Sequence, residues 1–198
     1  GELTRMMRYG ILGRYIPEFG DIIGMMEHDL FHIYTVDEHS LRMVRFLRHL
    51  RYGEERERFP LAAQLIQRIP KKDILYLTAL LHDTGKSISG NHTDNSGDIA
   101  AEFCRQHALR PAEAHMVSWL CSNHLLMSQA AQRLDLNNPE DVYEFALQVG
   151  DQFHLDCLYL ISVADIISTN PKGWTGWRAE QMKLLYNNCS EMLRRGLN

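Results

Sequence analysis

The chain has 198 residues, of which 45% are hydrophobic and 23% are charged, which is typical of a globular protein with a substantial core. Its formal net charge of −4 argues against a broad basic surface for nucleic acid, and no apolar run approaches the ~20 residues of a transmembrane helix. There is no signal-peptide pattern. We therefore expect a cytoplasmic protein with neither nucleic-acid nor membrane partners. The widely spaced cysteines predict reduced core thiols, at Cys104, Cys121, Cys157 and Cys189.

The first 35 residues are broken by glycines and Pro17, which predicts short turns or brief helices. We expect this leader segment, residues 1–35, to pack on a helical domain that comprises residues 36–198. The stretch 27–34 mixes polar and aromatic groups, and it suits a solvated loop as well as a loop that lines a cleft. Because the chain begins with Gly1 rather than Met, we expect it to be a piece of a longer protein.

A helical pattern begins at Thr35, where Thr35 or Asp37 can act as the N-cap and Glu38 follows three residues after Thr35. His39 falls on the apolar face of this helix. A single histidine in such a position is more often a satisfied core residue than a ligand, so its partners decide its role. The shared face comprises Val36, His39, Met43, Phe46, Leu47 and Leu50.

An apolar run from Ile74 to Leu81 leads into an adjacent pair, His82 and Asp83, and Lys86 follows one turn later. Imidazole and carboxylate groups at the end of an apolar helix are costly to bury unless something satisfies them, and a divalent metal ion does so. Lys86 would then meet an anion held at the metal. For an isolated His-Asp pair, a helix end with a polar fringe is the alternative.

The rest of the chain predicts more helices and shows no strand-like alternation, so the predicted fold class is an all-α helical bundle. Residues 87–98, which include His92, are expected to be polar and rich in turns. Trp174 and Trp177 are expected to pack at the start of a final amphipathic helix. The predicted helices cover residues 60–69, 99–109, 111–124, 128–134, 139–149, 155–167 and 174–193.

Asp165 lies in the most apolar part of the chain, where a carboxylate needs a strong partner. This position favours a ligand or a buried ion pair over a solvated side chain. Three separate apolar helix faces carry His39, the His82-Asp83 pair and Asp165. Two more histidines, His92 and His124, lie in the polar stretches between these helices. A helical bundle can gather all of these groups around one metal site. The candidate ligands are His39, His82, Asp83, His92, His124 and Asp165.

The order His…His-Asp…Asp resembles the HD-domain superfamily of metal-dependent phosphohydrolases, in which His39, His82, Asp83 and Asp165 match the pattern. Longer stretches resemble one group of this superfamily, the uridylyl-removing domains of bifunctional uridylyltransferases; they are residues 13–19, 28–39, 123–128, 163–166 and 193–196. The resemblance implies hydrolytic removal of UMP from the PII nitrogen-signalling protein. It also implies a parent chain that carries a nucleotidyltransferase domain and ACT domains.

One segment departs from that family. Thr84 and Gly85 stand where the family usually has Ile and Ala, whereas Lys86 and His92 keep their offsets from Asp83. We therefore expect metal binding to be retained and the substrate contacts of this turn to differ.

Imidazole and carboxylate ligands suit Mn²⁺ or Fe²⁺, and Mg²⁺ or Zn²⁺ are further options. Six ligands exceed the need of one ion, so we expect two ions that share Asp83, with Asp83 and Lys86 as the catalytic residues. Lys86, His32 and Asn123 are the expected substrate-binding residues. Two alternatives stay open: an HD enzyme that hydrolyses a free nucleotide or nucleotide second messenger, and a non-catalytic relay module stabilised by metal.

Overall fold

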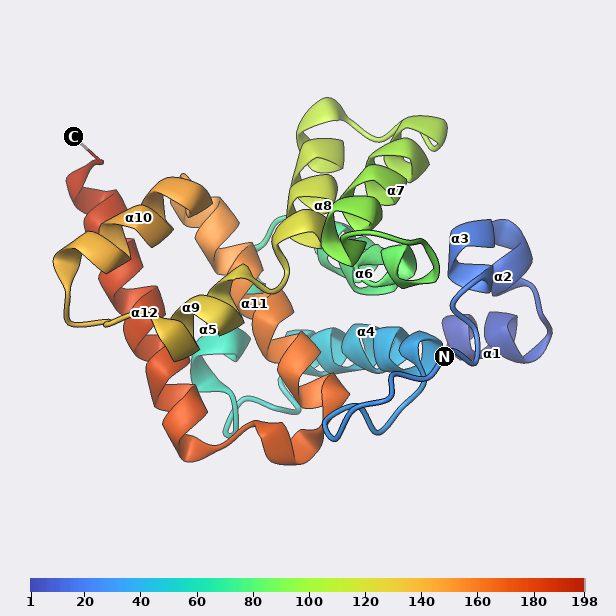
Figure 1. Cartoon of the computed structure of the whole chain (residues 1–198), viewed down its shortest axis with the longest axis horizontal. Helices are drawn as coiled ribbons and strands as arrows, with labels where there is room; N and C mark the ends of the chain where they lie inside the picture. The colour runs from blue at the N-terminus through green and yellow to red at the C-terminus, as the bar shows by residue number, and fades with distance from the viewer. Residues whose placement is uncertain (198) are drawn as a thin grey trace.

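The computed structural model describes residues 1–197 and confirms the all-α prediction, because these residues contain helices and no strand (Figure 1). Within the described residues, no helix combines the length and apolar character needed to span a membrane. The α-helices (α) and 3₁₀ helices (η) are α1 (Glu2–Arg8), α2 (Leu12–Tyr15), α3 (Pro17–Gly20), α4 (Val36–Tyr52), α5 (Pro60–Arg68), α6 (Asp73–Leu81), η1 (Thr84–Ser87), α7 (His92–Gln106), α8 (Pro111–Asn123), α9 (Leu126–Arg133), α10 (Pro139–Val149), α11 (Gln152–Thr169), η2 (Pro171–Gly173) and α12 (Gly176–Arg195).

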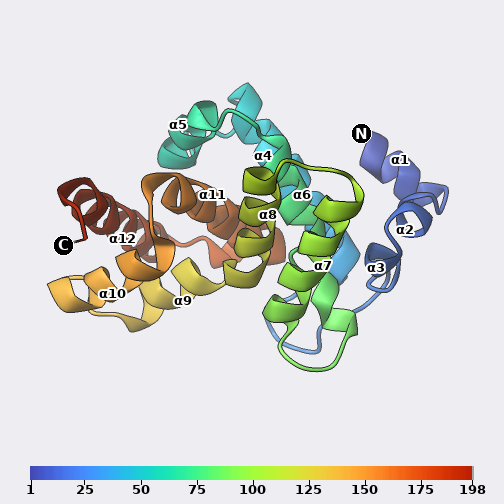
Figure 2. The same cartoon turned by 90° about the horizontal axis from the view of Figure 1, so that it is seen from above.

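Helix α11 lies at the centre of the bundle because it is apolar on every side. All side chains from Leu155 to Ala164 are buried, which is the behaviour of a helix with no polar face. It packs against α4, α5, α6, α8 and α12, and Figures 1 and 2 show it between α12 and α4. This placement brings one of its polar residues, Asp165, to the same region as the first turn of α4.

Helix α4 begins where the sequence predicts, but neither of the two candidate residues caps it with a side-chain hydrogen bond. Thr35 is the N-cap residue, yet its side chain makes no capping hydrogen bond. The Asp37 carboxylate instead accepts a hydrogen bond from the Gly24 backbone N–H at 2.9 Å. A tertiary contact with the preceding segment therefore takes the group that could have capped the helix.

Helix α7 begins earlier than predicted, since residues 92–98 form its first two turns rather than a turn-rich loop. The Asn91 side chain accepts a hydrogen bond from the Thr93 N–H and caps the helix. Gly97 allows α7 to approach α8, because a Cβ atom there would collide with the Ser122 side chain. The early start makes His92 the first residue of a packed helix.

The ends of the molecule are formed by α1–α3 on one side and by α10 and α12 on the other, as both views show (Figures 1 and 2). Helix α3 contacts η1, the turn that follows the His-Asp pair. The segment 27–34 is a loop that leads into α4. The division at residue 35 between leader and domain stays a prediction.

All four cysteines are buried and free, as predicted. Of the two tryptophans expected to pack, Trp174 does so against Phe59, with ring centroids 5.6 Å apart. The prediction for Trp177 is wrong, because its side chain is 61% exposed in the first turn of α12. Amphipathic spacing alone did not identify which side of that turn faces the core.

Candidate metal centre

The six predicted ligands converge from five different helices or helix ends. His39 lies in the first turn of α4, His82 and Asp83 follow α6, His92 begins α7, His124 follows α8, and Asp165 lies near the end of α11. The side chains of His39, His82, Asp83 and His124 are buried in the core. Helix ends position four of these residues, so the site depends on how the helices meet rather than on one motif.

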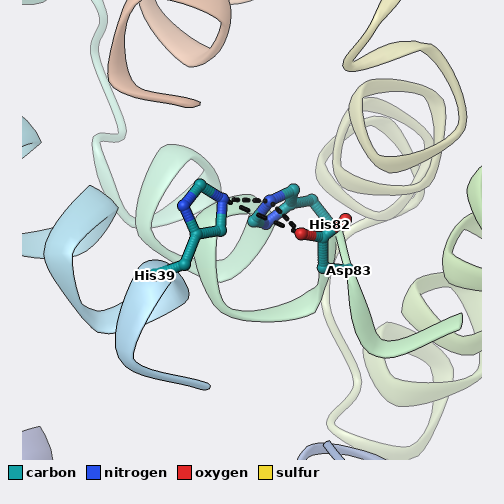
Figure 3. Close-up of side chains that lie close together, drawn as sticks. All are labelled: His39, His82 and Asp83. Atoms are coloured by element: carbon teal, nitrogen blue, oxygen red, sulfur yellow. Dashed lines mark hydrogen bonds and ion pairs between the residues drawn. The ribbon is translucent and has the colours of Figure 1, made fainter. Parts of the chain in front are cut away.

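One group of donor atoms is formed by His39, His82 and Asp83. Figure 3 shows His39 on α4 directed toward the His-Asp pair at the end of α6. The two Nε2 atoms lie 3.1 Å apart. The Asp83 Oδ2 atom lies 3.2 Å from His82 Nε2 and 3.7 Å from His39 Nε2. Three ligand atoms thus face one small volume.

Asp165 adjoins this first group. Its Oδ1 atom lies 3.0 Å from His39 Nε2 and 3.9 Å from His82 Nε2, and its side chain is 16% exposed. Burial alone lowers the pKa of His39, but the hydrogen bond to Asp165 and the nearby charges of both aspartates raise it above its usual value. The carboxylate in the apolar helix therefore has the strong partner that the sequence required.

A second group is formed on the other side of Asp83 by His92 and His124. The Oδ1 atom of Asp83 lies 3.6 Å from His124 Nε2 and 3.9 Å from His92 Nε2. One carboxylate therefore presents Oδ2 to one pair of imidazoles and Oδ1 to another. The sharing of Asp83 between two ions stays a prediction.

The orientation of two imidazoles is fixed by backbone carbonyls. His82 Nδ1 donates to the Ala79 carbonyl oxygen at 2.9 Å, and His124 Nδ1 donates to the Cys121 carbonyl oxygen at 2.8 Å. A carbonyl oxygen only accepts, so both rings carry a proton on Nδ1 and direct Nε2 toward the centre. Outer hydrogen bonds of this kind orient histidine ligands toward a metal.

The charge state of the centre suits cation binding. Burial raises the pKa of Asp83, but the charges of His82, Lys86 and His124 outweigh burial and hold it well below its usual value. Burial and the charge of His82 lower the pKa of His124 to about 4. Near neutral pH, Asp83 is therefore an anion and His124 is neutral, which are the states in which each binds a metal.

The residues present fit a divalent cation. Asp83 Oδ1 is buried without a hydrogen-bond partner in the described part of the chain, although buried carboxylate oxygens are nearly always satisfied. Nitrogen and oxygen donors without thiolates suit first-row divalent metals. The two groups of three donors each leave room for further ligands, as a catalytic metal site requires.

Lys86 lies next to the shared carboxylate, with Nζ 2.9 Å from Asp83 Oδ2 and 2.8 Å from Glu27 Oε2. Burial lowers its pKa, but the two carboxylates raise it above its usual value, so the side chain is cationic. Glu27 is a site residue that the sequence analysis missed. Its signal was present in the polar stretch before α4, but nothing in the sequence pairs that stretch with Lys86.

The two other predicted substrate-binding residues lie differently. His32 is in the loop before α4, where its Nε2 atom lies 2.7 Å from Glu27 Oε2, so it reaches the centre through Glu27 and Lys86. Asn123 immediately precedes His124, and its side-chain amide donates to the Trp119 carbonyl oxygen of its own helix at 2.9 Å. The roles of all the site residues remain predictions.

Curated relatives match nearly the whole chain. It is 51% identical over 196 residues to the bifunctional uridylyltransferase/uridylyl-removing enzyme of Pseudomonas aeruginosa strain UCBPP-PA14. The enzymes of the same name from Ectopseudomonas mendocina and Pseudomonas putida strain W619 are 51% and 50% identical. Each match covers 99% of this chain, and the chain spans about 22% of the length of these relatives.

The model of the HD domain family matches residues 36–185, which contain all six predicted ligands. The resemblance inferred from the sequence is thereby confirmed. Because the match covers most of the chain, this protein belongs to the HD domain family.

Proposed function

We propose that this chain is a metal-dependent phosphodiester hydrolase that removes UMP from uridylylated PII protein. The observation that carries the proposal is the position of Asp83, whose two oxygens face separate pairs of imidazoles. The names of the relatives join a uridylyltransferase with a uridylyl-removing activity. We assign the second activity to this chain because its ligand set is that of a hydrolase centre.

The proposed ligands are His39, His82, Asp83 and Asp165 for one ion and Asp83, His92 and His124 for the other, with Mn²⁺ or Fe²⁺ favoured. When bound, such ions would activate water and neutralise phosphate charge. The Lys86 ammonium adds a second positive group beside Asp83 for the phosphate oxygens. His32 and Asn123 are proposed to position the ester.

In the proposed reaction, the oxygen of water forms a bond to phosphorus while the bond from phosphorus to the tyrosine oxygen breaks. The products are UMP and the restored tyrosine. A phenol has a pKa of about 10, so its phenolate leaves with little help from a general acid. The proposed reaction therefore needs no residue dedicated to protonating the leaving group.

We further propose that residues 36–198 form the hydrolase domain, that residues 1–35 pack on it as a leader, and that the parent protein is cytoplasmic. The parent would carry nucleotidyltransferase and ACT domains in its remaining length. The proposal is supported by the finding that this chain spans about 22% of the length of relatives whose names give two activities.

The decisive test is release of UMP from uridylylated PII by this chain with Mn²⁺, compared with a chelator control. Metal-dependent release that disappears in Asp83→Ala, with helical content unchanged by circular dichroism, supports the proposal. Bound metal without release contradicts it. A parallel panel of free nucleotides would identify a nucleotidase instead, and bound metal with no hydrolysis of any phosphoester would identify a relay module.

A further inference from the structure

The loop before α4 exposes its apolar side chains, while Glu27 and His32 of the same loop are partly buried. We call residues 27–34 the rim loop (Figure 1, the blue segment leading into α4). Leu30 is 92% exposed and Phe31 is 69% exposed, and Ile33 is also exposed. Large apolar groups concentrated in this way on a surface loop mark an interaction site more often than isolated ones do.

Internal polar contacts hold the rim loop in this conformation. The Asp29 carboxylate accepts hydrogen bonds from the backbone N–H groups of Phe31 and His32, both at 2.8 Å. The ring of His32 lies between Asp29 Oδ2, at 2.6 Å, and Glu27 Oε2, at 2.7 Å. The exposed side chains are therefore presented by an ordered turn, which lowers the entropy that binding would cost.

The same contacts join the rim loop to the metal centre. Glu27 Oε2 lies 2.8 Å from Lys86 Nζ, which lies 2.9 Å from Asp83 Oδ2. A phosphoester that reaches Lys86 through a tyrosine side chain brings the polypeptide carrying that tyrosine close to Lys86. The rim loop is joined to Lys86 by Glu27 and exposes Leu30 and Phe31. A free nucleotide carries no polypeptide that could contact these two side chains.

We infer that Leu30 and Phe31 form a docking surface for the protein substrate, and that they contact apolar side chains near its uridylylated tyrosine. This inference rests on the proposed function. It makes the rim loop a determinant of substrate specificity: it adds affinity for a uridylylated protein and none for a small aryl ester of UMP.

The test compares two substrates on the Mn²⁺-loaded chain: uridylylated PII, and the small diester of UMP with 4-nitrophenol. The variants are Leu30→Ser and Phe31→Ser. The matched control is Leu147→Ser, because Leu147 is 51% exposed on α10, at the other end of the molecule. Metal content and thermal midpoint are measured for every variant to verify an intact centre and fold.

We expect each rim-loop variant to lower kcat/KM for uridylylated PII by about tenfold, the effect of losing one interface anchor, mainly through a higher KM. The small diester should be hydrolysed at the wild-type rate, and Leu147→Ser should leave both substrates unchanged. Unchanged kcat/KM for the protein substrate would overturn the inference, as would an equal loss on both substrates. Failure of the proposed function is distinguishable, because the wild-type chain itself would then not act on uridylylated PII.

Discussion

Glu27 and Lys86 form an ion pair, with 2.8 Å between Oε2 and Nζ, that connects the loop before α4 to the turn after the His-Asp pair. The carboxylate offsets the charge of Lys86, which lies beside the metal centre. A phosphate that approaches Lys86 therefore competes with Glu27 for it. This competition gives Glu27 a measurable influence on anion binding.

In Glu27→Gln, we expect the inhibition constant of UMP as a product inhibitor to fall by about threefold to tenfold, the size of one water-screened charge at short range. The measurement is inhibition of small-diester hydrolysis by UMP in the Mn²⁺-loaded chain. Glu102→Gln is the matched control, since Glu102 pairs with Arg105 on the exposed side of α7. An inhibition constant that stays constant or rises in Glu27→Gln would show that the pair does not compete with phosphate.

The two donor groups predict distinct changes in metal stoichiometry. His82→Gln should remove one Mn²⁺ and His124→Gln the other, whereas Asp83→Asn should disrupt both groups because Asp83 belongs to each. Isothermal titration with Mn²⁺ measures the number of ions, and His107→Gln, an exposed histidine paired with Tyr15, is the control. Hydrolysis by Asp83→Asn should fall by at least about 10²–10³-fold. Retention of two ions in Asp83→Asn would contradict the shared-ligand model.

Gly85 has a specific packing role beside His92. A Cβ atom at Gly85 would collide with the His92 carbonyl oxygen and lie 2.6 Å from the Ser96 backbone nitrogen. Gly85→Ala should therefore lower the free energy of unfolding by about 1–3 kcal/mol and weaken Mn²⁺ binding by displacing His92. Urea denaturation and titration measure the two effects. Gly176→Ala is the control, because a Cβ atom there meets nothing within 4 Å.

The buried histidine His124 predicts how stability depends on pH in the metal-free protein. Its pKa is lowered from 6.5 to about 4 by burial and by the charge of His82. Between these values the unfolded chain binds the proton and the folded chain does not, so stability falls as the pH falls from about 6.5 to 4. The loss from pH 7 to pH 5 attributable to His124 is about 2 kcal/mol.

Chelator-treated wild type and His124→Gln should be compared by urea denaturation at pH 7 and pH 5. The difference in unfolding free energy between the two pH values should be about 2 kcal/mol larger for the wild type. His39, whose pKa is raised, acts in the opposite direction in both proteins and cancels in the comparison. Equal differences in the two proteins would show that His124 is solvated.

Most of the fold was predicted from helical periodicity and from the residues that begin or end helices. Pro60, Pro111 and Pro139 each begin the helix that the sequence assigns to them, and the apolar run around Leu158 is the central helix. Errors arose where tertiary contacts decided the outcome. The polar composition of residues 92–98 suggested turns, but these residues are helical, with Asn91 as the cap and Gly97 packed against α8.

The candidate site likewise contains residues that the sequence identifies and a residue that only the fold reveals. Asp165 and the His-Asp pair are conspicuous in the sequence because polar groups in apolar helices need partners. Glu27 is not, because an acidic residue in a polar loop is ordinary until the fold brings it to Lys86. The assignment of each histidine to one of two donor groups also depends on distances that spacing along the chain does not contain.

The six proposed ligands belong to segments that run from His39 to Asp165 and include the five helices that build the middle of the bundle. Ions bound there would act as cross-links between those segments and would favour the folded chain according to their concentration and affinity. Catalytic competence and global stability are then thermodynamically linked. A substitution that loosens the contact of α4 with α11, far from any ligand, would weaken metal binding, and depletion of metal would lower the cooperativity with which the whole bundle unfolds.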